Sequence, residues 1–150
     1  MDIKDTALKY LASRARTSGE MKRHLTEKGF EQEQIRELID QLKELRYLDD
    51  EDYCIRYFEY AFAKGKGIMR VKRELEEKGV KREGIDLSWE EYDPSETELS
   101  RAEKQAAKVA EGRTPDQKLI GKIGRKLTSL GYSSDIIYQV IGKYMRNQDQ

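Results

Sequence analysis

An arginine stands six residues before a glycine in three separate stretches of the sequence, as Arg23, Arg73 and Arg125. The guanidinium group is a planar fork of hydrogen-bond donors that matches carboxylate and phosphate oxygens. A row of three arginines could therefore bind an acidic protein surface or a nucleic-acid backbone. The alternative is ordinary pairing on helix surfaces, because Arg23–Glu27 and Arg73–Glu77 have the i,i+4 spacing of ion pairs that contribute about 0.2–0.5 kcal/mol each.

Further cations stand near these arginines and are densest in the middle stretch, where Gly65 and Gly67 loosen the chain. The segment Lys64-Gly65-Lys66-Gly67 lacks the spacing and the preceding strand of a phosphate-binding P-loop, so we interpret it as a basic turn. The residues that we expect to contact a nucleic acid or an acidic partner are Arg14, Arg16, Arg23, Lys64, Lys66, Arg70, Lys72, Arg73, Lys122 and Arg125.

Residue types that perform catalysis or bind metals are scarce. One histidine, His24, and one cysteine, Cys54, argue against a His-rich metal site and exclude a disulfide framework or a thiolate zinc cluster. The sequence contains no HExxH motif, nucleophile elbow or dinucleotide fingerprint. The acidic run from Asp49 to Asp52 fits helix capping better than a calcium loop. We expect no catalytic residue, metal or cofactor, and we interpret Cys54 as a small buried hydrophobic residue.

An internal repeat aligned on Gly29, Gly79 and Gly131 places these side chains. The apolar spacing before and after each glycine is that of helical faces, and the repeated arginine points away from the apolar positions. Glycine suits a helix C-terminus, where a positive φ is common, so each repeat contains a helix, a tight turn and a second helix. The equivalent apolar residues are Met21, Val71 and Ile123; Leu25, Leu75 and Leu127; Phe30, Val80 and Tyr132; Ile35, Ile85 and Ile137; Ile39, Trp89 and Ile141; and Leu42, Tyr92 and Tyr144.

A further helix precedes each pair, and Asp93-Pro94-Ser95 breaks any helix between the second and third repeats. The expected ranges of these first helices are about 5–15, 50–63 and 96–110. We therefore predict an all-α protein of nine helices without strands. The predicted repeats are three tandem three-helix units over residues 1–48, 49–94 and 95–150.

Two capping boxes predict where helices begin. In the first, Thr17 and Glu20 cap each other's backbone amides. In the second, Thr114 pairs with Gln117, which would make Pro115 the first helical residue.

The predicted helix over residues 50–63 is apolar around most of its circumference. A helix of this kind must be covered on more than one side, which suits a middle repeat. We interpret its side chains, and Trp89, as core, although tyrosines that stack on nucleic-acid bases are an alternative. The two neighbouring stripes are Tyr53, Tyr57 and Tyr60, and Cys54, Phe58, Ala61 and Phe62.

The net charge of zero is a cancellation between 29 basic and 29 acidic residues. The charge is +3 over residues 1–28, −6 over 31–52, +5 over 64–82, −7 over 83–103 and +5 over 113–146. We predict a basic ridge along the second helices and an acidic one elsewhere. This distribution excludes a uniformly basic DNA-binding protein but allows a two-sided one.

No segment reaches the roughly 18 apolar residues that a membrane-spanning helix needs. Met1 leads directly into Asp2, so we expect no secretory signal.

Two N-terminal stretches each carry a distinctive combination of motifs. The first carries Ala7-Leu8-Lys9-Tyr10-Leu11-Ala12, Arg14, Arg16-Thr17, Glu20-Met21, Leu25 and Lys28-Gly29-Phe30. The second carries Tyr47-Leu48-Asp49-Asp50, Tyr53-Cys54, Lys66-Gly67, Arg70, Glu74-Leu75 and Lys78-Gly79. In combination these motifs resemble the RecX family of bacterial regulators. The resemblance covers nearly the whole chain and is weakest from about Asp86 to Gly112, and Cys54 stands where the family usually has a small residue.

This resemblance implies an elongated, curved molecule of three tandem three-helix repeats. It also implies a non-catalytic, cytoplasmic and monomeric regulator in DNA repair, recombination and the SOS response. Its partner would be the RecA recombinase filament on single-stranded DNA, whose strand exchange and ATP hydrolysis it would inhibit. The alternative from the residues themselves is a helical-repeat protein that binds DNA directly through its basic ridge.

Overall fold

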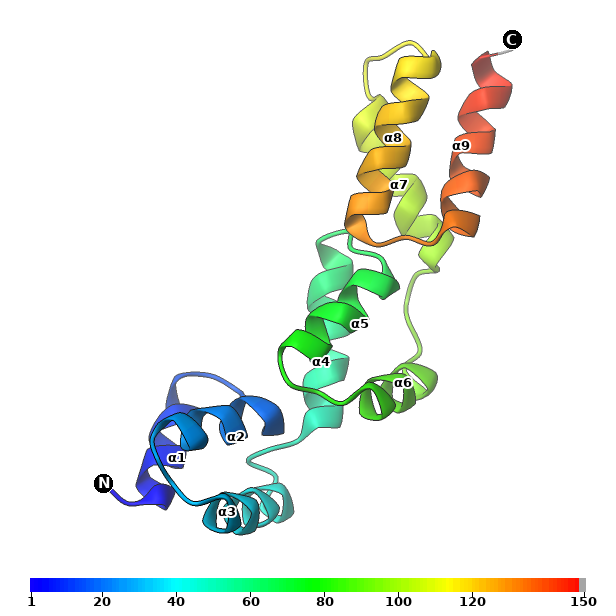
Figure 1. The fold of residues 1–150 in the computed structure, drawn as a ribbon. Helices are drawn as coiled ribbons and strands as arrows, with labels where there is room; N and C mark the ends of the chain where they lie inside the picture. Colours follow the sequence, from blue (N-terminus) through cyan, green and yellow to red (C-terminus); the bar gives the residue numbers. More distant parts are fainter. Residues whose placement is uncertain (149–150) are drawn as a thin grey trace. The chain divides into compact units, whose positions relative to one another are not determined.

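The computed structural model describes residues 1–148, and these residues form nine α-helices and no strand (Figure 1). The all-α prediction is therefore confirmed for this part of the chain. The expected first helices correspond to α1, α4 and α7. The bounds are α1 (Ile3–Ser13), α2 (Ser18–Glu27), α3 (Gln32–Glu44), α4 (Asp50–Ala63), α5 (Ile68–Glu77), α6 (Arg82–Glu91), α7 (Glu98–Ala110), α8 (Gln117–Leu130) and α9 (Ser134–Gln148).

The described helices divide into two compact units, and the division runs through α4 and α5. The first unit consists of Met1–Tyr57 and Glu74–Tyr92, and the second consists of Phe58–Arg73 and the chain from Asp93 onward. In the first unit α1, α2 and α3 pack on one another, and in the second α7, α8 and α9 do so (Figure 1). The division into three repeats stays a prediction.

The repeated apolar positions form the cores. The side chains eight and four residues before each glycine are fully buried in all three copies, and those six residues after it are at most 9% exposed. Each buried side chain of this size stabilises the fold by about 1.5–3 kcal/mol. Cys54 is buried as predicted, whereas Trp89, at a repeat position we interpreted as core, is half-buried and stacks on Tyr92.

The helix ends explain why the glycines recur. Gly29, Gly79 and Gly131 have φ values of 89°, 95° and 93°, which a residue with a Cβ adopts only with strain. At the start of α2 the predicted capping box is present. The Glu20 amide donates to Thr17 Oγ1 and the Thr17 amide donates to Glu20 Oε1, both at 3.0 Å.

The second predicted capping box is wrong. Asp116 is the N-cap residue of α8, and its Oδ1 accepts a hydrogen bond of 2.8 Å from the Leu119 amide. With Asp116 as the N-cap, the residue three positions on is Leu119, so Thr114 and Gln117 do not occupy the two positions of a capping box. Pro115 therefore precedes the helix rather than being its first residue.

In the first unit, the N-terminus of α2 lies against the C-terminal end of α5. The Thr17 hydroxyl donates to the Lys78 carbonyl oxygen at 2.5 Å, and the Ser18 amide donates to Asp50 Oδ1 at 2.8 Å. A Cβ on Gly19 would overlap the carbonyl oxygen of Gly79. Glycine at this position therefore allows the two backbones to touch.

The second unit repeats this contact between the N-terminus of α5 and the C-terminal end of α8. The Gly67 amide donates to the Leu130 carbonyl oxygen at 2.7 Å, and a Cβ on Gly67 would overlap the carbonyl oxygen of Gly131. The Tyr132 hydroxyl donates to the Gly65 carbonyl oxygen at 2.7 Å. Burial raises the pKa of Tyr132 to about 12, so this hydroxyl keeps its proton across the physiological range. We call these two contacts the glycine junctions.

The glycine junctions predict a specific sensitivity to one methyl group. Gly19→Ala should lower the free energy of unfolding by about 1–3 kcal/mol, because the new Cβ forces two backbones apart. In contrast, a Cβ on Gly84 in α6 would meet only Val80 Cγ1 at 3.8 Å. Gly84→Ala should raise the free energy of unfolding by about 0.5–1 kcal/mol, as alanine usually does inside a helix. Urea denaturation of both variants tests this, and equal effects would contradict it.

Candidate functional site

The loop between α1 and α2 holds two of the predicted site residues, and both have partners within the first unit. Arg14 Nη2 lies 2.9 Å from Glu20 Oε2. The Arg16 guanidinium lies 3.8 Å from the centroid of the Tyr10 ring, and its Nε donates to the Tyr10 carbonyl oxygen at 3.2 Å. These contacts stabilise the loop. Whether either arginine also contacts a partner stays a prediction.

Glu20 links the arginine loop to the helix cap. Burial alone would raise the pKa of Glu20, but hydrogen bonds from Arg14 and from the Thr17 amide outweigh burial and hold the pKa below its usual value. The ionised carboxylate is therefore the form that the folded state prefers.

The three repeated arginines are exposed on α2, α5 and α8. Among the described residues, Arg23 does not pair with Glu27 and Arg73 does not pair with Glu77, so the alternative of ordinary helix pairing is wrong for both. Arg125 Nη1 lies near Gly121, where a Cβ would stand 3.2 Å away. Arg23 belongs to the first unit and the other two to the second, so a continuous arginine row stays a prediction.

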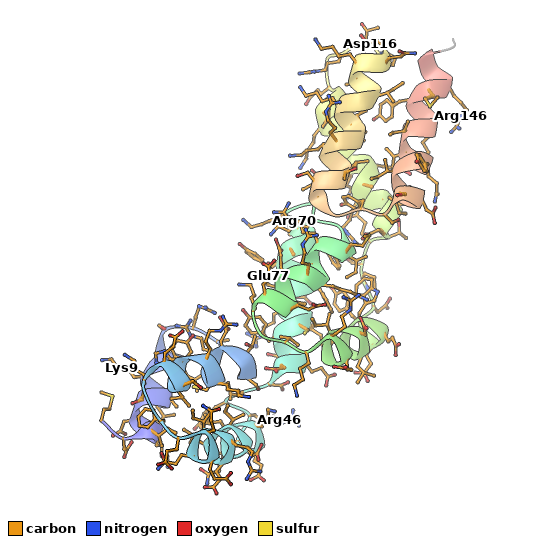
Figure 2. All side chains as sticks on the ribbon, in the orientation of Figure 1. Lys9, Arg46, Arg70, Glu77, Asp116 and Arg146 are labelled. Atoms are coloured by element: carbon orange, nitrogen blue, oxygen red, sulfur yellow. The ribbon has the colours of Figure 1, made fainter. Side chains whose placement is uncertain are left out.

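The basic turn between α4 and α5 mixes exposed and engaged cations. The Lys64 ammonium lies 5.0 Å from the centroid of the Tyr60 ring, which is 55% exposed. Arg70, labelled on α5 in Figure 2, donates from Nη1 to the Ser129 carbonyl oxygen at 3.1 Å. Lys66 and Lys72 are half-buried. Lys64 is therefore the most accessible cation of the turn itself, with Arg73 following on α5.

The structure brings most of the predicted set into the second unit. Lys122 and Arg125 are exposed on α8, and Arg73 is exposed on α5. The first unit contributes only Arg14, Arg16 and Arg23. The members in the second unit are Lys64, Lys66, Arg70, Lys72, Arg73, Lys122 and Arg125.

Sequence reasoning missed a buried arginine in α7. Arg101 is 4% exposed, its guanidinium lies 3.7 Å from the centroid of Phe62, and it pairs with Glu98. Its Nη1 donates to the Glu96 carbonyl oxygen at 3.0 Å, whereas its Nε has no hydrogen-bond partner in the described structure. The i,i+3 spacing of Glu98 and Arg101 was the available signal, but such spacing also occurs on exposed helices.

Glu98 connects this buried arginine to the start of α5. Its Oε2 accepts a hydrogen bond of 2.9 Å from the Ile68 amide, which directly follows Gly67 of the second glycine junction. Burial raises the pKa of Glu98 above its usual value, although the Ile68 amide and Arg101 oppose the rise. Desolvation therefore outweighs the ion pair, so the pair provides no large net stabilisation, and the hydrogen bond from the Ile68 amide is what joins Glu98 of α7 to α5.

No group of three or more histidine, cysteine, aspartate or glutamate side chains in residues 1–148 could hold a metal ion. Within the same range, each helix is too short or too polar to cross a bilayer.

The fold and these surfaces define an all-α protein built from three-helix domains with clustered surface cations. Two family models match the chain. One is described as RecX, first three-helix domain, over residues 4–42, and the other as RecX, second three-helix domain, over residues 49–87. The chain belongs to the RecX family.

Curated relatives agree with this assignment. The chain is 34% identical over 140 residues to the regulatory protein RecX of Pseudomonas fluorescens, and the match covers 93% of this chain and 89% of the relative. It is 30% identical to the regulatory protein RecX of Mycolicibacterium smegmatis, covering 97% of this chain and 80% of the relative. Some relatives are longer, and the chain spans 52% of the regulatory protein RecX of Oceanobacillus iheyensis.

Solved structures show the same fold. The crystal structure of RecX from Lactobacillus salivarius has a TM-score of 0.83 and 24% identity, and the match covers 96% of this chain and 95% of that chain. A second crystal structure, of regulatory protein RecX, has a TM-score of 0.77 and 23% identity, with coverage of 95% and 74%.

The Glu20 interactions predict a pH-dependent loss of stability. Glu20→Gln should lower the free energy of unfolding at pH 7 by up to about 1 kcal/mol, because glutamine can still accept from the Thr17 amide but loses the charge that attracts Arg14. Because the folded pKa of Glu20 is depressed, its contribution is present above the unfolded pKa of about 4.3 and is lost as pH falls through the folded value. In urea denaturation at pH 7 and at pH 3, the difference between the parent and the variant should shrink. A constant difference would contradict the ionic role.

Proposed function

We propose that this chain binds the RecA filament on single-stranded DNA and inhibits its recombinase and ATPase activities. The observation that carries the proposal is membership of the RecX family, with both three-helix family models matched in order. The protein would be a monomeric, cytoplasmic regulator in DNA repair, recombination and the SOS response, with no catalytic activity of its own.

The exposed cations support a partner of this kind. Lys64, Arg73, Lys122 and Arg125 are exposed in the second unit, and phosphates or carboxylates of a filament are the groups that such side chains attract. Exposed charges of this type accelerate association and make it sensitive to salt. The acidic segments would at the same time disfavour binding to bare duplex DNA.

One observation favours direct binding to single-stranded DNA as a second function. Tyr60 is 55% exposed and carries the Lys64 ammonium over its ring, an arrangement that offers both a stacking surface and a charge. Under this alternative the protein would bind an oligonucleotide without RecA, and the logarithm of its affinity would fall steeply with the logarithm of salt concentration. Fluorescence anisotropy of a labelled oligonucleotide, with and without RecA, separates the two functions.

The direct test measures DNA-dependent ATP hydrolysis by RecA across a titration of this protein. We expect hydrolysis to fall as the protein approaches the concentration of RecA. The protein alone should hydrolyse no ATP, which serves as the control. Unchanged hydrolysis at several-fold molar excess, together with no co-sedimentation with the filament, would overturn the proposed function.

The surface cations predict which substitution weakens inhibition. Arg73→Glu should raise the protein concentration needed for half-inhibition about tenfold or more, because it replaces an exposed cation on α5 by a repelling charge. Glu90→Lys, an exposed change of opposite sign on α6, should have a smaller effect. Both variants should keep the parent melting temperature. Equal half-inhibition concentrations for the two variants would contradict the role of Arg73.

A further inference from the structure

A pocket of about 510 Å³ lies in the first unit, between α1 and the end of α2. Its lining includes the aromatic residues Tyr10, His24 and Phe30 and the lysines Lys9 and Lys28. Its lining contains no carboxylate. Its volume falls within the roughly 300–1,000 Å³ that is usual for small-molecule sites. The proposed contact with RecA makes no use of this pocket.

A stack of three planar groups forms one side of the pocket. The rings of Tyr10 and His24 are parallel within 3°, with centroids 3.8 Å apart. The Arg16 guanidinium lies 3.8 Å from the same Tyr10 centroid. Two groups at this distance from one ring must occupy its opposite faces, so the order of the stack is Arg16, Tyr10, His24.

His24 is the end of this stack. Tyr10 covers one face of the imidazole, no second aromatic ring among the described residues stacks on the ring, and His24 lines the pocket. Burial lowers the pKa of His24 below its usual value, and the charges of Lys28 and Arg16 lower it further, although Glu27 opposes them. The ring is therefore neutral at pH 7, which suits stacking.

The lysines supply the complementary charge. Lys28, the C-cap residue of α2, follows His24 by four residues, so both side chains lie on one face of the helix end, and Lys9 reaches the pocket from α1. Figure 2 labels Lys9 at the surface of α1. Two ammonium groups beside an aromatic ring in the pocket lining match a ligand that joins a planar base to a phosphate.

We propose that this pocket binds one nucleotide unit, with the base stacked on His24 and the phosphate held by Lys9 and Lys28. The unit is either a free mononucleotide or one residue of a single-stranded nucleic acid, since both present the same base and phosphate. This binding needs only the isolated protein, so its test is independent of the proposed inhibition of RecA.

His24 is the single histidine of the chain, so its ring protons give an unambiguous NMR signal. The full chain is titrated separately with thymidine 5′-monophosphate, with a short oligothymidylate and with inorganic phosphate. We expect both nucleotide ligands to shift the His24 ring signals and the amide signals around Lys28. The bound phosphate should also raise the pKa of His24. If the oligonucleotide binds more tightly than thymidine 5′-monophosphate, the ligand of the pocket is a residue of a nucleic-acid strand. If the two bind equally per site, the ligand is the free nucleotide.

Matched variants locate the site. The double variant Lys9→Glu, Lys28→Glu should weaken binding of thymidine 5′-monophosphate at least tenfold, and His24→Gln should weaken it without changing the fold. Lys22→Glu is the control, because Lys22 is equally exposed on α2 but does not line this pocket. Its binding should stay within twofold of the parent.

Three outcomes would overturn the proposal. The first is an unchanged His24 signal with both nucleotide ligands. The second is an equal shift with inorganic phosphate at the same concentration, because it would show an anion site without base recognition. The third is an equal loss of binding in Lys22→Glu and in the double variant, because it would show a diffuse charge effect.

Discussion

Each unit of this protein depends on a contact between the start of one helix and the end of another, with glycine on both sides. Backbone amides at a helix N-terminus and carbonyls at a C-terminus lack partners within their own helix and carry opposite partial charges. In one unit the Thr17 hydroxyl meets the Lys78 carbonyl, and in the other the Gly67 amide meets the Leu130 carbonyl. The glycine junctions give these groups hydrogen-bond partners directly. They thereby add to the stability that small hydrophobic cores provide in a chain with 39% charged residues.

Because the junctions use mainly backbone groups, glycines and the Thr17 hydroxyl, with Asp50 as the carboxylate in the first junction, they leave most charged side chains outside. Arg70 is an exception, since its guanidinium bonds the Ser129 carbonyl beside the second junction. Glu98 is another, since its carboxylate accepts from the Ile68 amide at the start of α5. Both examples show charged side chains reinforcing a junction whose main contact is already made by the backbone. The cations that stay exposed are then available to a partner without weakening the fold.

The helical positions and the turn glycines could be predicted from the sequence because both depend on residues within a few positions of each other. The junctions could not be predicted, because Gly19 and Gly79 are 60 residues apart and nothing local marks their contact. We interpreted Gly67 only as loosening a basic turn, although it is a contact point. Similarly, the burial of Arg101 against Phe62 depends on a distant part of the chain. The ion pair between Arg73 and Glu77 that the sequence allowed is absent from the described residues for a local reason. Helical spacing permits such a pair on an exposed surface but does not require it.

The candidate site contains two kinds of arginine that a sequence-based charge count treats as equal. Arg16 lies on Tyr10, as Arg101 lies on Phe62, and a guanidinium that covers an aromatic ring acts at short range within the fold. Arg73 is exposed, so its field reaches roughly the 8 Å Debye length of physiological salt before it is screened. The +3 of residues 1–28 therefore overstates what the first unit offers to a distant partner, since Arg14 and Arg16 are already engaged. The second unit, with exposed cations on both α5 and α8, is the stronger candidate for the first encounter with an acidic partner such as the proposed filament.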